Sequence, residues 1–158
     1  MTRTLLGPLC LGLSLACQST GAASPPPAPP VSAAPLADAG PQQLVRSSYV
    51  LEIDAPTVAV GAEGKLRIRM RANAGWHVNK EFPTSLVVEA PAGVEVKKPK
   101  QSAADATTKS ETELVFEVAF VAREAGAKQL PATFKFAVCT DKSCEPQREK
   151  LQLAITAR

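Results

Sequence analysis

Apolar and polar positions alternate along the chain from about residue 46 to its end, as in strands that bury one face. The clearest stretch is 65–71, where Leu66, Ile68 and Met70 face one way and four cations face the other. Turn residues separate successive stretches, and none shows strong helical periodicity. The expected strands are 49–53, 58–60, 65–71, 76–79, 86–89, 94–97, 114–120, 130–139 and 151–155.

Seven to nine short strands without a helix, in about 110 residues, predict an all-β, immunoglobulin-like β-sandwich. A small β-barrel is the alternative fold. The polar segment 98–108 has no large apolar residue and is expected to be a loop. The expected core consists of the apolar residues that alternate along these strands: Leu66, Ile68, Met70, Trp76, Val78, Leu114, Phe116, Val118, Phe120, Phe134, Phe136, Val138, Leu151, Leu153 and Ile155.

The first 17 residues follow a different pattern. Arg3 precedes a short apolar run at 5–16 that contains Gly and Pro, which predicts a secretory signal peptide over residues 1–17. The run ends in Ser-Leu-Ala-Cys17, which resembles a bacterial lipobox and makes Cys17 the expected lipidation site. Ordinary cleavage after Ala23 is the alternative. A multi-chain acyl anchor would hold the exported protein on a membrane, with the periplasmic face of a bacterial outer membrane as the expected location.

Residues 18–45 are rich in Pro and Ala and carry a single charge, Asp38. Seven of the 14 prolines lie between Ser24 and Pro41. Such a segment cannot bury enough apolar surface to fold, and its prolines keep it extended. We therefore expect a disordered linker over 18–45 and a folded domain over 46–158.

The overall composition argues against several classes of function. The formal net charge is only +3, and the cations are interleaved with anions, so no nucleic-acid footprint is visible. One histidine and two methionines do not favour a copper or zinc site, and no cofactor is expected. No serine stands in a nucleophile motif. The four cations of 65–71 are interpreted as a solvated strand face.

Two of the four cysteines remain for the folded domain, because export would remove Cys10 and lipidation would use Cys17. Cys139 and Cys144 flank a four-residue turn between two antiparallel strands. Directly opposed residues of such strands have Cα atoms about 4.5 to 5.5 Å apart, which a disulfide accepts. Alternation turns Cys139 away from the face of Phe136, toward the outside of the sheet or beneath whatever covers it.

A disulfide in this place is either a structural bond that stabilises the hairpin or a redox-active bond that reacts with other thiols. It closes a loop of about six residues. The resulting loss of entropy in the unfolded chain would stabilise the fold by about 2 kcal/mol, near the low end for disulfides. The spacing alone leaves both roles open. The chain has no Cys-x-x-Cys and no thioredoxin-like βαβ pattern, so the domain itself is not a thioredoxin.

Three segments resemble the N-terminal periplasmic domain family of the thiol:disulfide interchange protein DsbD: Gly-Trp-His-Val-Asn-Lys at 75–80, Leu-Val-Val-Glu at 86–89, and Phe-Ala-Val-Cys-Thr-Asp-Lys-Ser-Cys-Glu-Pro-Gln at 136–147. The resemblance covers roughly residues 50–155 and implies an immunoglobulin-like fold. It implies that Cys139 and Cys144 cycle between dithiol and disulfide, which would make the chain a protein-disulfide reductase component. Electrons would come from a thioredoxin-fold redox protein in trans and pass to periplasmic disulfide proteins, with Cys144 the sulfur that the partner attacks.

The turn between the cysteines is one residue shorter than in well-known members of that family. Those members also cover the pair with a loop that carries an aromatic residue, and the segment assigned to that role here, 98–108, has none. Trp76 and His77 are the candidate modulators of the pair, although His77 is expected to be a half-exposed surface residue. The alternative function is a non-catalytic immunoglobulin-like binding or scaffold lipoprotein with a structural hairpin disulfide.

Overall fold

The computed structural model describes residues 42–158. The expected signal peptide, Cys17, the alternative cleavage point at Ala23 and residues 18–41 of the linker lie outside the described residues. Between residues 42 and 158, no helix is long and apolar enough to cross a membrane.

One sheet, called sheet A here, contains the strand of alternating cations. All of its strand pairs are antiparallel. Its strands, in spatial order, are β1 (Gln42–Val45), β2 (Tyr49–Asp54), β4 (Glu63–Ala72), β10 (Glu113–Ala122) and β7 (Val94–Val96), and β9 (Thr108–Lys109) also pairs with β10.

The second sheet, sheet B, contains the cysteine hairpin. Its strands, in spatial order, are β3 (Thr57–Val58), β12 (Cys144–Ala157), β11 (Gly126–Cys139), β6 (Ser85–Val88) and β8 (Lys100–Ser102), and β5 (His77–Val78) also pairs with β11. The short pair of β3 with β12 is parallel and involves only the last two residues of β12. The rest of β12 has no strand on that side within residues 42–158.

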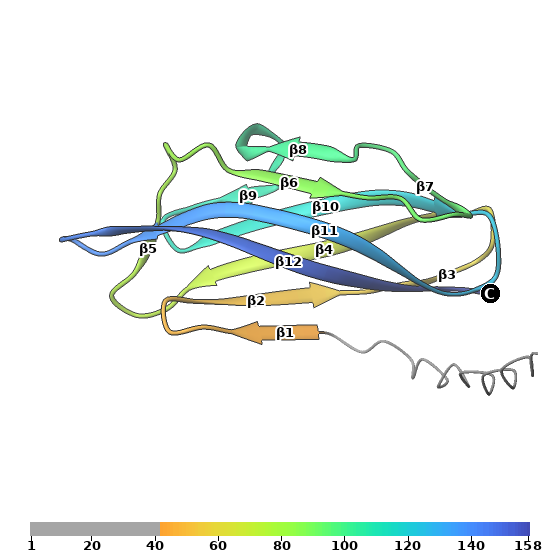
Figure 1. The fold of residues 1–158 in the computed structure, drawn as a ribbon, viewed down its shortest axis with the longest axis horizontal. Coiled ribbons are helices and arrows are strands. Elements are labelled where there is room, and N and C mark those ends of the chain that lie inside the picture. The colour runs from red at the N-terminus through yellow and green to blue at the C-terminus, as the bar shows by residue number, and fades with distance from the viewer. Residues whose placement is uncertain (1–41) are drawn as a thin grey trace, which may run out of the picture. The chain divides into compact units, whose positions relative to one another are not determined.

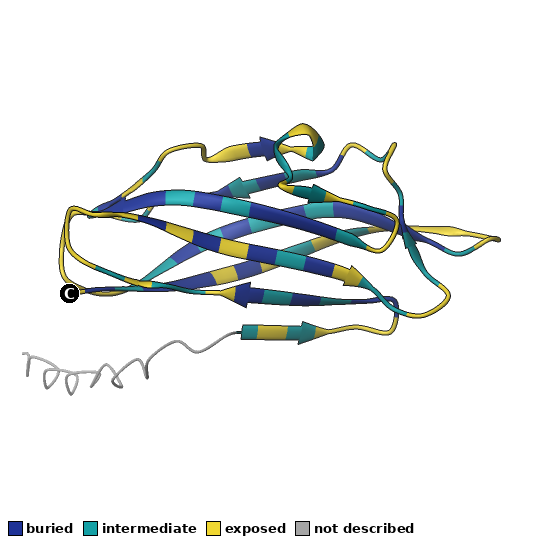
Figure 2. Ribbon diagram, turned by 180° about the vertical axis from the view of Figure 1, so that it is seen from behind, coloured by how far each residue is buried: buried dark blue, intermediate teal, exposed yellow. Residues whose placement is uncertain are grey.

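The two sheets pack face to face, so the predicted immunoglobulin-like β-sandwich is confirmed (Figure 1). Buried and exposed residues alternate along the strands, as the sequence pattern predicted (Figure 2). Every predicted core residue is buried except Trp76, which is half-buried and packs against the core from its rim. The predicted strand periodicity therefore identifies the inner face of both sheets.

Aromatic rings connect the two sheets inside the core. Phe116 of sheet A meets Phe134 of sheet B edge to face, with ring centroids 5.5 Å apart. Tyr49 of sheet A meets Phe136 in the same way at 4.8 Å. Such pairs contribute about 0.5–1.5 kcal/mol beyond the area that they bury, so this row stabilises the end of the sandwich nearest the cysteines.

A polar contact closes the side of the sandwich beside these rings. Glu149 of β12 lies opposite Phe134 and therefore faces inward. It accepts hydrogen bonds from the Tyr49 hydroxyl and from Arg46 Nε, the latter at 3.0 Å. Burial of Tyr49, and then its bond to Glu149, raise the pKa of its phenol well above the ordinary value. Arg46, Tyr49 and Glu149 thus tie β2 of sheet A to β12 of sheet B.

Two boundaries differ from the sequence prediction. Residues 42–45, assigned to the linker, form β1 at the edge of sheet A, so they belong to the sandwich. The expected loop 98–108 contains β8, a 3₁₀ turn at Ala103–Asp105 and the first residue of β9. Hydropathy missed β8 because its inward position holds a polar residue, Gln101, which is buried and donates from Nε2 to the Glu117 carbonyl at 2.9 Å.

Candidate functional site

The cysteines lie at the end of the hairpin that β11 and β12 form. This hairpin projects beyond the rest of the sandwich (Figure 1). Its ladder runs through fourteen residue pairs and ends at the pair Cys139 and Cys144. The two sulfurs are bonded to each other, and the Cα atoms are 4.0 Å apart because the residues stand directly opposite each other. The separation is slightly below the expected 4.5 to 5.5 Å.

The turn beyond the disulfide is held by its own hydrogen bonds. The Thr140 backbone N–H donates to the Ser143 carbonyl at 2.8 Å. The Thr140 hydroxyl oxygen in turn accepts from the backbone N–H groups of Lys142 and Ser143, at 3.3 and 3.2 Å. Ser and Thr side chains stabilise turns in this way because they mimic a backbone acceptor. The end of the hairpin therefore keeps its shape without a core beneath it.

The two cysteines differ in burial. Cys144 is exposed, whereas only 3% of Cys139 is accessible. Cys139 does lie on the outer face of sheet B, as alternation predicted, because its neighbour Val138 points into the core. It is buried there because β5 lies along the other side of β11 and places His77 directly opposite Cys139. A reagent from solvent therefore has access to Cys144 only.

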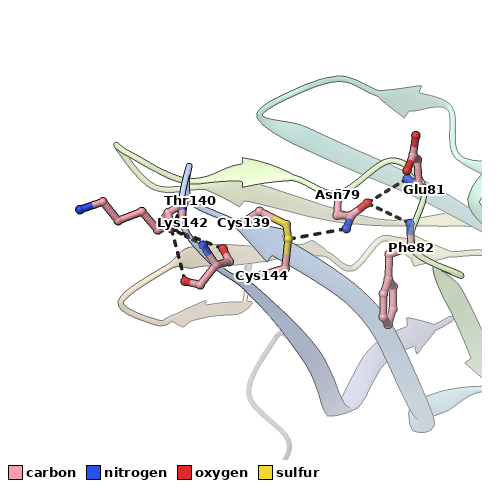
Figure 3. Close-up of a disulfide and its surroundings, with 8 residues drawn as sticks. Asn79, Glu81, Phe82, Cys139, Thr140, Lys142 and Cys144 are labelled. Carbon is pink, nitrogen blue, oxygen red and sulfur yellow. Dashed lines mark hydrogen bonds between the residues drawn. A yellow bond between two sulfur atoms is a disulfide. The ribbon is translucent and has the colours of Figure 1, made fainter.

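Asn79, which follows β5, is the residue that contacts the disulfide. Its side-chain nitrogen Nδ2 lies 3.9 Å from Cys144 Sγ (Figure 3). Its side-chain oxygen accepts from the backbone N–H groups of Glu81 and Phe82, at 3.0 and 3.1 Å. Its backbone N–H donates to the Ala137 carbonyl at 3.0 Å. Three hydrogen bonds thus hold Asn79 in place, with its side-chain nitrogen beside the exposed sulfur.

Sequence reasoning missed Asn79, although a signal was present. Asn side chains commonly bond backbone N–H groups two residues on, and Asn79 stands before a proline-containing loop where such a turn is favoured. The same turn brings up an aromatic residue, Phe82, which is half-buried. Its ring points away from the sulfurs (Figure 3). The segment 98–108, which was assigned the covering role, instead pairs through β8 with β6 and through β9 with β10.

The two candidate modulators occupy different places. Trp76 packs against the core, whereas His77 stands beside Cys139 in the sheet. On its other side, β5 meets the turn that carries Glu111, whose carbonyl accepts the Val78 N–H at 2.7 Å. The bonded Lys80 ammonium, and more weakly the nearby His77, hold the pKa of the Glu111 carboxyl below its usual range. Of the two, only His77 is placed to influence a sulfur directly.

Three of the four cations of β4 pair with carboxylates on the neighbouring strands, which agrees with the interpretation of this face as a solvated one. Glu117 bonds Arg67 at 3.2 Å, and Arg69 lies 3.0 Å from Glu113 and 3.8 Å from Glu52. A hollow on this face is lined by Arg69, Arg71, Ala72, Thr112 and Glu113, on the sheet that does not carry the cysteines. Among residues 42–158, no group of three or more His, Cys, Asp or Glu side chains is arranged to hold a metal ion.

No protein-family model matches this chain, and no curated protein matches it. Among solved structures, the GAE domain of GGA2p from Saccharomyces cerevisiae is 10% identical, with a TM-score of 0.39 over 72% of this chain and 96% of that one. The BIgI domain of beta protein from S. agalactiae, bound to CEACAM1, is 11% identical, with a TM-score of 0.33 over 70% of this chain and 96% of that one. PapD-like domain 7 of human CEP192 is 14% identical, with a TM-score of 0.32 over 74% and 94%. These likenesses concern the fold, and the question of function rests on the site itself.

Proposed function

We propose that the domain is a thiol–disulfide exchange module whose reactive group is the Cys139–Cys144 pair. The observation that carries this proposal is the asymmetry of the pair: an exposed sulfur bonded to a buried one, at the projecting end of a hairpin. A disulfide with one accessible sulfur accepts attack at a single atom and leaves the other sulfur protected from unwanted partners.

A purely structural bond would have little to do in this position. The fourteen ladder pairs between β11 and β12 already hold the two strands together. The bond closes only a short turn, for which the entropy estimate is about 2 kcal/mol at most. A bond between the two sheets would constrain far more of the unfolded chain. The position of the disulfide therefore favours access by a partner thiol more than it favours the stability of the fold.

The proposed reaction conserves atoms and electrons. A thiolate of a partner dithiol attacks Cys144 Sγ, the Cys139–Cys144 bond breaks, and Cys139 leaves as a thiolate. The second partner thiol, once deprotonated, attacks the mixed disulfide and releases Cys144 as a thiolate. Two electrons have then moved from the partner, which becomes a disulfide, to this domain, which becomes a dithiol. The reverse sequence passes the electrons to a substrate disulfide.

Two side chains are placed to assist these steps. The Asn79 Nδ2–H group points at the atom that becomes the Cys144 thiolate, and hydrogen bonds to the charged form of a group favour that form. His77 lies opposite Cys139, where a protonated imidazole would favour its departure as a thiolate. We assign both residues positioning and electrostatic roles.

The resemblance to the DsbD N-terminal domain family supplies the proposed context. The donor is then a thioredoxin-fold protein in trans, and the acceptors are periplasmic disulfide proteins. Export, followed by lipid attachment at Cys17 or by cleavage after Ala23, would place the domain in an oxidising compartment, where a reductant of this kind is needed.

The second candidate function is an immunoglobulin-like binding or scaffold domain with a fixed disulfide. The burial of Cys139 and the self-bonded turn favour it, since both would also suit a bond that is never broken.

The reduction potential separates the two functions. The protein is equilibrated in thiol–disulfide buffers of stepped potential, and its free thiols are counted by alkylation and mass measurement. We expect a midpoint above about −300 mV, in the range of exchangeable pairs, whereas structural disulfides lie below that value. A midpoint below −300 mV would sink the exchange proposal and favour the scaffold.

A further inference from the structure

On the outer face of sheet B, exposed residues lead away from the disulfide along β12, through Cys144, Pro146, Arg148 and Lys150, whereas Cys139 and Ala137 of β11 are buried. Strand register places Cys139 beside Cys144, then Ala137 beside Pro146, then Lys135 beside Arg148. Each step of two residues advances about 6.6 Å along the strands, so this cationic pair lies about 13 Å from the sulfurs. The residues between are small, and none carries a charge.

The cations continue along the same face. The next row of the hairpin pairs Thr133 with Lys150. Through β6 this row extends to β8, where Lys100 stands opposite Val87. Arg148, Lys150 and Lys100 are exposed, and Lys135 is half-buried. We call these four residues the cationic strip.

The cationic strip is not neutralised by the domain itself. In the part of the chain that the structure describes, no member of the strip forms an ion pair. The outer face of sheet A is different, because there Lys65, Arg67 and Arg69 all pair with carboxylates. The two faces carry similar numbers of cations, but among residues 42–158 sheet A leaves only Arg71 of its β4 cations unpaired, whereas all four cations of the strip are free for an external anion.

We propose that the cationic strip docks the acidic surface of a thiol partner and so directs the partner's reactive cysteine to Cys144. This proposal rests on the proposed exchange function and adds the charge of the partner surface to it. Complementary charge raises the rate of encounter by about tenfold or more and fixes the orientation of the two proteins. Orientation matters here because only one sulfur is accessible.

An anionic membrane is the other surface that four cations could meet. The protein partner is favoured because the strip is continuous with the exposed sulfur. A membrane bound to this face would also cover Cys144. The carboxylates nearest the sulfurs, Asp141 and Glu145, lie at the tip and on the inward-facing side of β12, away from the strip.

The test uses three seven-residue peptides with a central cysteine, flanked by glutamates, glutamines or lysines. Each peptide thiolate attacks Cys144 of the oxidised protein, forms a mixed disulfide and releases the Cys139 thiol. The second-order rate constant is measured by the appearance of that thiol at 20 and 200 mM salt. We expect the glutamate peptide to react about tenfold faster than the lysine peptide at low salt, with the difference collapsing at high salt. Reduction by uncharged dithiothreitol calibrates the reactivity of the bond in every variant.

A charge-reversed variant, Lys135→Glu with Arg148→Glu, should abolish or invert the preference for the acidic peptide. The matched control is Arg71→Glu, because Arg71 is exposed on the outer face of sheet A and forms no ion pair within residues 42–158. It should retain the preference. A preference that survives in the double variant, or that disappears in the control, contradicts the proposal.

The outcomes distinguish a failure of the docking proposal from a failure of the exchange function on which it rests. If dithiothreitol reduces the bond readily but the three peptides react at equal rates, the docking proposal fails and the exchange function stands. If the bond resists dithiothreitol at potentials above −300 mV, the exchange function fails, and the docking proposal falls with it. Strip-dependent binding to phosphatidylglycerol vesicles, with no peptide preference, would identify a membrane surface and overturn the proposal.

Discussion

Asn79 shows how one turn can place a side chain beside a residue that is distant in the sequence. Its oxygen fixes the turn at 79–82, which leaves its nitrogen aimed at Cys144 Sγ. The backbone bond to Ala137 keeps Asn79 in register with the hairpin. A thiolate formed on Cys144 would therefore meet a donor that is already in place, without any reorganisation of the chain.

This arrangement predicts opposite roles for the two ends of the amide. Asn79→Asp keeps the acceptor for Glu81 and Phe82 but replaces the donor with a carboxylate that repels a thiolate. Alkylation of the reduced protein by iodoacetamide at pH 7 should slow by about three- to tenfold, and its pH profile should move to higher pH.

Asn79→Ala is the matched variant, because it removes both ends of the amide without adding charge. It should slow alkylation less than Asn79→Asp at the same pH. Equal pH profiles for the wild type and both variants would show that the contact with Cys144 Sγ has no chemical effect.

Gly64 illustrates packing at the level of the strand. It lies in β4 with its backbone buried, and a Cβ atom there would come within 2.6 Å of Val58 Cγ1 and 2.7 Å of Phe120 Cζ. Real Cβ contacts of that length essentially do not occur, so β3 or the Phe120 ring would have to move. Glycine is required here for close approach between neighbouring elements.

We therefore expect Gly64→Ala to lower the free energy of unfolding by about 1–3 kcal/mol, as overpacked core substitutions do. Urea unfolding monitored by Trp76 fluorescence measures the change. Ala62→Ser, in the exposed turn two residues earlier, is the control and should unfold at the wild-type midpoint. A Gly64→Ala midpoint that matches the control would mean that β3 shifts without cost.

Sequence predicted most elements because their inward positions are apolar. β4 alternates cleanly, and all predicted core residues of β4, β10 and β11 are buried. β8 was missed because Gln101 satisfies its amide in the interior, and hydropathy cannot show a buried polar residue that has found a partner. β1 was missed because it is a short edge strand in which only Leu44 packs on the core.

The site was predictable only where it is local in sequence. Cys139 and Cys144 are five residues apart, so a hairpin was enough to pair them. The burial of Cys139 and the contact at Cys144 come instead from residues 77–82, about sixty positions earlier. Register between β5 and β11 decides those contacts, and the alternation of one strand carries no information about which strand lies beside it.

At the scale of the whole molecule, the groups that connect the two sheets are different from the disulfide. The aromatic row and the Arg46–Tyr49–Glu149 contact connect the sheets, while the disulfide connects only two neighbouring strands of sheet B. The groups that connect the sheets are therefore separate from the disulfide, although they lie at the same end of the domain.

Reduction should consequently leave the fold intact. We expect the dithiol form to keep the near-ultraviolet circular dichroism of the disulfide form and to lose about 2 kcal/mol or less of unfolding free energy. The double variant Cys139→Ala, Cys144→Ala provides a thiol-free control and should behave like the reduced protein. Unfolding on reduction would instead show that the sandwich requires the disulfide for its stability.

Within residues 42–158, most of one side of β12 has no strand partner, and this free edge also affects how copies of this chain meet. A free strand edge recruits strands from other chains and so promotes aggregation. In an antiparallel ladder, closely spaced pairs such as Cys139 and Cys144 alternate with hydrogen-bonded pairs, so Ala137 and Pro146 also form a closely spaced pair. The backbone N–H of a residue in such a pair points away from the partner strand, here toward the free edge of β12. Pro146 has no N–H to offer there. Two copies pairing antiparallel through β12 would also bring Arg148 and Lys150 of one against those of the other. The residues proposed to attract an acidic partner would therefore also oppose such a pairing of identical molecules.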